Sequence, residues 1–149
     1  MAGYFQRHDG HVYEGAYRAG ETLTSGLFVE ITANGVKKIT AAGDAEFRVE
    51  EKTTLWGMPA LRLVCVVPGE DEIYVTELET ENYGDKGDFN DAEFSIPTGH
   101  YVKMRRPVIN DMLIVTTDGT TYAALAVGNT VLPASGGGVA KKTSERSEA

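Results

Sequence analysis

The stretch GETLTSGLFVEITANGVKKIT, residues 20–40, decides the fold, because part of its pattern returns near the C-terminus. Each copy predicts a tight turn, a strand, a glycine turn and a strand end with two lysines. Either the copies are equivalent corners of one barrel, or the spacing recurs by chance in a glycine-rich chain. The copies are Leu23-x-x-Gly26-x-x-Val29 with Gly35-Val36-Lys37-Lys38, and Leu125-x-x-Gly128-x-x-Val131 with Gly138-Val139-Ala140-Lys141-Lys142.

The segments around the first copy also indicate strands. Asn34-Gly35 is the residue pair of a type I′ turn, so residues 27–32 and 36–40 are predicted to form a hairpin. Phe47 and Val49 alternate with polar residues, as on a strand with one solvated face. A short helix over residues 44–52 is the alternative, because Glu, Arg and Lys favour helices.

The second half of the chain continues the same pattern. Residues 61–67 are the most apolar stretch and suit a central strand. Asp118-Gly119 is a second hairpin signal. We predict an all-β fold, either a small barrel or a sandwich. The remaining predicted strands are residues 73–78, 94–96 paired with 101–104, 112–116, 121–126 and 131–132.

The two ends of the chain do not share this regularity. Residues 1–19 hold scattered aromatic residues with no period of 2 or 3.6, so they are predicted to be an arm that wraps its own domain or docks on a neighbour. Residues 20–133 are the predicted β domain. Residues 134–149 are predicted to be a glycine-rich linker and a polar tail, because Ser135-Gly-Gly-Gly138 is flexible by composition.

Composition limits the function classes. A length of 149 residues suits one domain, and a net charge of −8 argues against general nucleic-acid binding. Cys65 is the single cysteine, so it has no disulfide partner within the chain and is interpreted as a buried thiol. No apolar run approaches the ~20 residues that span a bilayer, and no signal peptide is evident, which favours synthesis in the cytoplasm.

Few residue groups indicate chemistry. The acidic loop 79–93 contains the candidate calcium ligands Asp85, Asp88 and Asp91, but their spacing does not fit an EF-hand. The loop could instead be solvated or dock on a basic partner. Arg105 and Arg106 form the main basic cluster, for which ion pairs with this loop, within or between subunits, are expected. His8 and His11 lack a third metal ligand.

The repeated glycine units, together with Asn110-Asp111 before an apolar strand, resemble small head decoration or cement proteins of tailed bacteriophages. The resemblance implies a non-enzymatic virion protein without a cofactor, located on the capsid surface. It would bind the major capsid protein and copies of itself, as a dimer or trimer, with no membrane and no direct nucleic-acid contact. The expected partner-binding residues are Tyr4, Phe5, Arg7, Tyr13, Tyr17, Arg105 and Arg106, because Tyr, Phe and Arg make good interface anchors.

Two other functions stay open on the sequence. One is a β-barrel recognition module for carbohydrate or protein, with Trp56, Tyr83 or Tyr101 as its platform. The other is a hydrolase that uses carboxylates of the acidic loop with His100, although no Ser or Cys partner for a triad is evident near that histidine.

Overall fold

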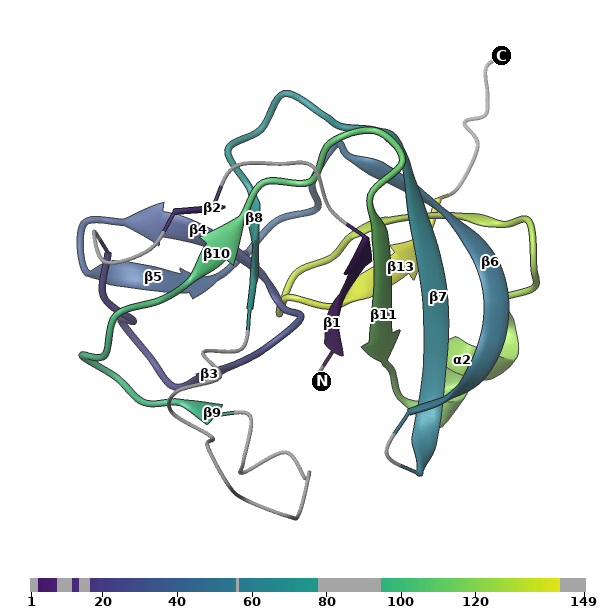
Figure 1. Ribbon diagram of the computed structural model, residues 1–149, viewed down its shortest axis with the longest axis horizontal. Coiled ribbons are helices and arrows are strands. Elements are labelled where there is room, and N and C mark those ends of the chain that lie inside the picture. The colour runs from purple at the N-terminus through teal and green to yellow at the C-terminus, as the bar shows by residue number, and fades with distance from the viewer. Residues whose placement is uncertain (1–2, 8–11, 14–16, 56, 78–94, 143–149) are drawn as a thin grey trace.

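The computed structural model describes residues 3–7, 12–13, 17–55, 57–77 and 95–142. The described chain is all-β, as the sequence predicts, with antiparallel sheets and one short helix. Figure 1 shows two groups of strands, one around β6 and β7 and the other around β4, β5 and β10. The sheets are open, and the strands within the described ranges form no closed barrel.

The larger sheet has six strands around the apolar segment that was predicted to be central. β7 (Met58–Val67) lies between β11 (Met112–Thr116) and β6 (Glu46–Leu55). Gly57, with φ +81°, lies in the turn that joins β6 to β7. The strand prediction for residues 44–52 is thus confirmed and the helix alternative is wrong. The outer strands are β1 (Gly3–Arg7) beside β11, and β12 (Thr130–Pro133) followed by β13 (Val139–Lys141) beside β6.

The smaller sheet has five short strands. Two isolated bridges, Arg18 with Tyr101 and Ala19 with Val36, connect its edge strand β5 to the segment that enters β10. These bridges curl the sheet on itself. The strand order is β2 (Val12–Tyr13), β10 (Met104–Arg105), β8 (Tyr74–Thr76), β4 (Phe28–Thr32) and β5 (Gly35–Lys38).

The hairpin β4–β5 forms where the sequence predicts it, but with another turn. A type I′ turn requires positive φ at both central residues. Here the positive φ of +106° falls on Gly35, which pairs with Thr32, and Asn110 is the one non-glycine residue of the described chain with positive φ. The Thr32 hydroxyl adds to the turn by accepting from the Asn34 amide at 3.1 Å and donating to the Gly35 carbonyl at 2.7 Å.

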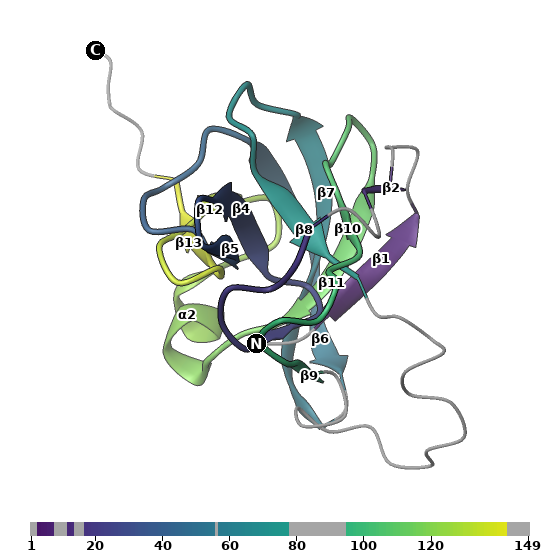
Figure 2. The same cartoon turned by 90° about the vertical axis from the view of Figure 1, so that its left-hand side faces the viewer.

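The two sheets enclose two separate apolar cores that share one wall. Phe28 and Val75 form a registered pair that packs into the core of the six-stranded sheet. The next pair, Val29 and Tyr74, faces the core of the five-stranded sheet, because side chains alternate along a strand. The strands β4 and β8 are therefore buried on both faces at these positions. In Figure 2 the smaller sheet lies in front of the larger one.

Three predictions for the second half of the chain are wrong. Residues Gly119–Ala124 form the helix α2, in place of the hairpin turn predicted at its start and the strand predicted for 121–126. The Asp118 carboxylate caps the N-terminus of this helix by accepting from the Thr121 amide at 2.8 Å. Ser95–Ile96 (β9) pairs with Leu23–Thr24 (β3), not with residues 101–104.

The predicted flexible linker is instead part of the fold. Residues 134–138 turn the hairpin β12–β13, and the Gly137 carbonyl accepts from the Phe28 amide at 2.9 Å. The second copy of the repeat thus forms the turn, strand, glycine turn and strand end that its pattern predicts.

Candidate interaction surface

Part of the predicted N-terminal arm is a strand of the protein's own sheet. β1 pairs with β11, and β2 pairs with β10, so of the two alternatives for the arm these residues lie on their own domain. Tyr4 is 38% exposed on β1. Gly26, with φ +77°, approaches the backbone of Gly3 so closely that a Cβ on Gly26 would lie 2.6 Å from the Gly3 nitrogen. The structure describes Phe5, Arg7 and Tyr13 only by their backbone.

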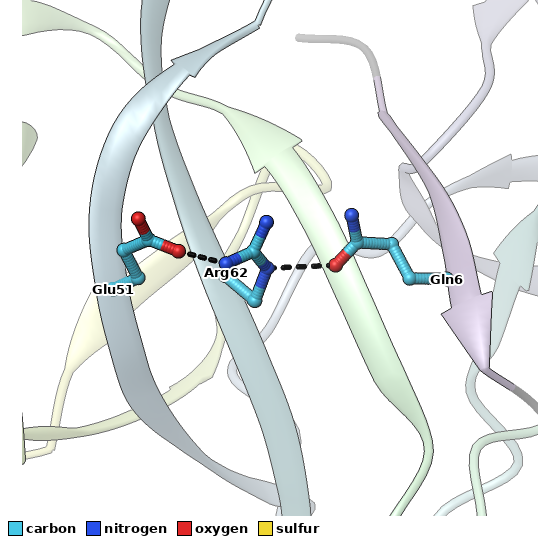
Figure 3. Close-up of polar contacts among 3 residues, drawn as sticks. All are labelled: Gln6, Glu51 and Arg62. Carbon is cyan, nitrogen blue, oxygen red and sulfur yellow. Dashed lines mark hydrogen bonds and ion pairs between the residues drawn. The ribbon is translucent and has the colours of Figure 1, made fainter.

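Polar contacts across strands also hold β1 in place. Arg62 on β7 lies between Glu51 on β6 and Gln6 on β1, as Figure 3 shows. Its Nε donates to Gln6 Oε1 at 2.8 Å, and its Nη1 pairs with the Glu51 carboxylate. The charge of this arginine is therefore balanced within the chain, on the solvated face of the six-stranded sheet.

Arg105 and Arg106 are also engaged within the chain, and the burial of Arg105 corrects its assignment to partner binding. Arg105 is 7% exposed and its Nε donates to the Glu77 carboxylate at 2.8 Å. Arg106 donates from Nη2 to the carbonyl oxygens of Glu70 and Asp71, both at 3.1 Å. The ion pair of Arg105 lies within the subunit, but its partner Glu77 precedes the acidic loop 79–93 with which the sequence predicted ion pairs.

A different arginine lies exposed on the smaller sheet. The Arg18 guanidinium stacks over the Tyr101 ring, with its Cζ 4.5 Å from the ring centroid. Nη2 donates to the Tyr101 hydroxyl at 3.0 Å, and Nη1 donates to the Gly99 carbonyl at 3.2 Å. These three contacts hold the side chain in one place, but all three partners are neutral.

Strand register places a second exposed group on the other face of the smaller sheet. Ile31 pairs with the buried Val36, whereas Arg18 alternates with Ala19, the residue that bridges to Val36. Ile31 and Glu72 line one groove, as expected when the pairing of β4 with β8 is continued by two residues. We call the exposed group of Tyr17, Arg18 and Tyr101 the Arg18 rim.

The loop before β8 has its own support. The Asp44 carboxylate accepts from the Glu70 amide at 2.8 Å and from the Asp71 amide at 3.2 Å. These backbone hydrogen bonds, that of Glu70 first, lower the pKa of Asp44 from its usual value. The loop that leads into Glu72 is thereby tied to the strand end before β6.

Most of the residues singled out for catalysis or metal binding lie outside the described ranges. Asp85, Asp88 and Asp91 lie outside the described residues, as do His8, His11, Trp56 and Tyr83. Within the ranges that the structure describes, no group of three His, Cys, Asp or Glu side chains is placed to hold a metal ion. His100 is exposed, and its carbonyl accepts from the Ala19 amide at 2.8 Å.

Cys65 is fully buried, as interpreted from the sequence. Burial raises the pKa of its thiol to about 12, and the nearby charge of Asp111 adds to this shift. A thiol with so high a pKa is not a nucleophile at neutral pH. None of the described helices is long and apolar enough to cross a membrane.

Sequence reasoning identified Tyr17 and Tyr101 but missed Arg18 and Ile31. Tyr17 is 37% exposed and Tyr101 is 51% exposed. Arg18 directly follows Tyr17 within the aromatic segment, which was the one available signal. Its stacking partner lies 83 residues away in sequence, and only the fold reveals the pair. Comparison of the chain with family models, with curated proteins and with solved structures finds no match.

Proposed function

We propose that this chain is a structural protein of a bacteriophage particle. It binds the surface of the assembled capsid and stabilises it by bridging neighbouring capsid subunits. The observation that supports this proposal best is the Arg18 rim, where a fixed guanidinium stacks on the exposed ring of Tyr101 and directly follows the exposed Tyr17. Tyr and Arg dominate the energetics of protein interfaces, because they combine a large contact area with directed hydrogen bonds.

The mechanism is physical. A rigid body of two packed sheets presents the rim, and many copies on a regular surface act together, so each contact can be weak. The interlocked core favours this role, because strands from both ends of the chain, β1 and β13, belong to the same six-stranded sheet. Such a body transmits force between neighbours without a conformational change.

The test is co-sedimentation of the purified chain with undecorated capsids. We expect binding that saturates and a gain in the heat resistance of the capsid. Substitution of Arg18→Ala together with Tyr101→Ala should weaken binding by about tenfold or more, the scale of an interface hot spot. Val127→Ala is the matched control, because Val127 is 62% exposed in the turn before β12 of the six-stranded sheet.

The result that contradicts the proposal is a folded chain that neither co-sediments with capsids nor changes their heat resistance.

A recognition module for carbohydrate or protein is the second candidate, and Tyr101 supports it through its exposure. A sugar would stack on the face of an aromatic ring, but Arg18 covers one face of the Tyr101 ring. Only the other face would serve as a platform. A glycan array distinguishes this candidate, since it expects binding that is lost on Tyr101→Ala and kept on Arg18→Ala.

A further inference from the structure

We propose that the groove lined by Ile31 and Glu72 binds a lysine or arginine side chain of a partner protein. The groove, of about 420 Å³, is formed by the end of β4, by residues 39–42 after β5 and by residues 71–73 before β8. We call it the Ile73 groove. The inference does not rest on the proposed function, because the groove shares no lining residue with the Arg18 rim and its binding is a property of the isolated chain.

The walls of the Ile73 groove are fixed within the single chain. The Asp44 carboxylate accepts from the amides of Glu70 and Asp71, so it ties the segment after β5 to the loop before β8. The two segments also pack closely, since a Cβ on Gly43 would lie 2.6 Å from Ile73 Cδ1. A groove that is already formed loses little conformational freedom when it is occupied.

The base of the groove is apolar. Ile39 is 2% exposed, and Ile73 packs against the core of the six-stranded sheet. Ile31, which is 38% exposed, extends this apolar surface toward solvent. Lysine and arginine bury their methylene stems along such a surface while their charged ends stay in a polar environment.

The remaining lining is acidic. Glu30, Asp71 and Glu72 line the groove, and none of the described basic residues lines it. None of these three acids forms an ion pair with a cation of the described chain. The ion pairs between described residues use four other carboxylates, those of Glu46, Glu50, Glu51 and Glu77.

Two neighbouring cations are directed elsewhere. Lys37 lies opposite Glu30 in register, but its Cε lies 3.1 Å from the position of a Cβ on Gly20, beside the edge of β5 that faces away from β4. Arg106 donates to the carbonyl oxygens of Glu70 and Asp71. The acids of the groove are therefore left to a cation from another molecule.

Charge complementarity identifies the occupant. An apolar base beside carboxylates suits a cationic side chain with a long apolar stem, which is the description of lysine and arginine. A second copy is a poor source of this side chain, because the chain carries a net charge of −8 and like charges repel. The occupant that we infer is a separate protein with a basic surface.

The first experiment follows the isoleucine methyl signals of the full chain by NMR during titration with a capped peptide. The probe is Ac-Ala-Ala-Arg-Ala-Ala-NH2, and the matched control peptide carries citrulline, which has the shape of arginine without its charge. We expect the arginine peptide to shift the signals of the three isoleucines in the groove, with a dissociation constant on the order of 1 mM because one side chain makes the contact. The citrulline peptide should bind about threefold to tenfold more weakly. The three isoleucines that do not line the groove are internal controls, namely Ile96, Ile109 and Ile114.

The second experiment removes charge from the groove. Glu30→Gln together with Glu72→Gln should weaken binding of the arginine peptide by about fivefold and leave the citrulline peptide unchanged, because side-chain volume is kept. Glu50→Gln together with Glu51→Gln is the matched control, since it removes the same charge from β6 of the larger sheet. Raising salt from about 0.05 to 0.5 M should weaken the arginine peptide more on the unchanged chain than on the groove variant. The dispersion of the methyl signals shows that each variant is folded.

Four results would overturn the inference. They are no shift of the groove isoleucines at up to about 10 mM arginine peptide, equal binding of the two peptides, equal weakening by the two double variants, and shifts of the groove isoleucines when the chain alone is concentrated. The last result would make a second copy the occupant. Because capsids are absent, failure here leaves the proposed function to co-sedimentation, and failure of co-sedimentation leaves the groove to the peptide titration.

Discussion

Arg62 and Arg18 are side chains on the surfaces of the two sheets, yet they differ in the partners that hold them. Arg62 lies on the six-stranded sheet between Gln6 and Glu51, so its charge is balanced by a carboxylate from the neighbouring strand. Arg18 lies on the five-stranded sheet with a carbonyl, a hydroxyl and an aromatic ring as partners. The first arginine ties strands together, whereas the second keeps its binding capacity for another molecule.

The difference follows from where each sheet can place opposite charges. On the larger sheet, long adjacent strands bring Arg62 opposite Glu51 in register. On the smaller sheet, the residues beside Arg18 are Gly35 and Tyr101, neither of which carries a carboxylate. Surface pairs such as Arg62–Glu51 contribute little to stability, about 0–1 kcal/mol, because water screens them. The lack of such an ion pair at Arg18 therefore lowers the stability of the fold only slightly.

The largest expected effect tests whether the two sheets unfold as one cooperative unit. Phe28 is fully buried on the shared wall, and its ring meets that of Phe47 edge to face at 5.4 Å. Phe28→Ala should lower the free energy of unfolding by about 3–5 kcal/mol, because it leaves a cavity in the core. We expect one cooperative transition in urea, measured in parallel by far-UV circular dichroism and intrinsic fluorescence.

Val127→Ala serves as the control for Phe28→Ala, since Val127 is 62% exposed and its truncation should change stability little. Two separate transitions in the Phe28 variant would contradict the shared wall and make the two sheets independent units.

The next effect separates a structural arginine from a binding arginine. The side chains of Arg105 and Glu77 are 8% and 14% exposed, so Arg105→Met should destabilise the fold by about 3 kcal/mol by leaving a poorly solvated carboxylate. Arg18→Met should cost less than about 1 kcal/mol, because its contacts are exposed. Binding to capsids should show the reverse order, with the larger loss for Arg18→Met. Urea unfolding and co-sedimentation with capsids measure the two orders.

If both substitutions changed stability equally, the distinction between the two arginines would be lost.

A smaller effect compares the two copies of the repeat. Gly26 and Gly128 have φ of +77° and +96°, so alanine at either position costs about 1–2 kcal/mol in backbone strain. A Cβ at Gly26 would also meet the backbone of Gly3, whereas a Cβ at Gly128 meets nothing within 4 Å. Gly26→Ala should therefore be the more destabilising and should lower the hydrogen-exchange protection of β1. Equal effects would argue against the close packing of β1 on this turn.

The predictions that depend on residues close together in sequence are confirmed more often than those that depend on contacts between distant residues. The hairpin at Gly35 and the central strand β7 depend on local turn residues and apolar content, and both were predicted. The Asp118-Gly119 pair was ambiguous, because Asp also caps helices and here does so for α2. The composition of residues 134–138 suggested flexibility, but a long-range hydrogen bond to Phe28 fixes them.

The candidate site was harder to predict than the fold. Tyr17 is anticipated by residue type alone, because aromatic residues in an irregular segment tend to anchor interfaces. Arg105 was assigned to a partner for the same reason, yet its ion pair with Glu77 lies inside the protein. Whether an arginine meets a carboxylate depends on strand pairing between residues distant in sequence, so composition cannot separate Arg18 from Arg105.

The smallest effect concerns the loop before β8 and its pH dependence. Hydrogen bonds from the amides of Glu70 and Asp71 lower the pKa of Asp44 below its usual value of 3.8. The ionised carboxylate thus adds stability above pH 3.8, and this stability is lost as the pH falls through the lowered value. Asp44→Asn should flatten that part of the profile, measured by urea unfolding between pH 7 and pH 3. Because Asp44 is exposed, the effect on stability is small.

Asp118→Asn is the matched control for Asp44→Asn. Hydrogen bonds from the Thr121 amide and hydroxyl lower the pKa of Asp118 in the same direction, but Asp118 caps α2 and not the loop before Glu72. Both variants should lose acid sensitivity, whereas only Asp44→Asn should lower the hydrogen-exchange protection of the Glu70 and Asp71 amides, since it weakens the acceptor of both. Equal loss of protection in both variants would mean that the Asp44 carboxylate does not hold this loop.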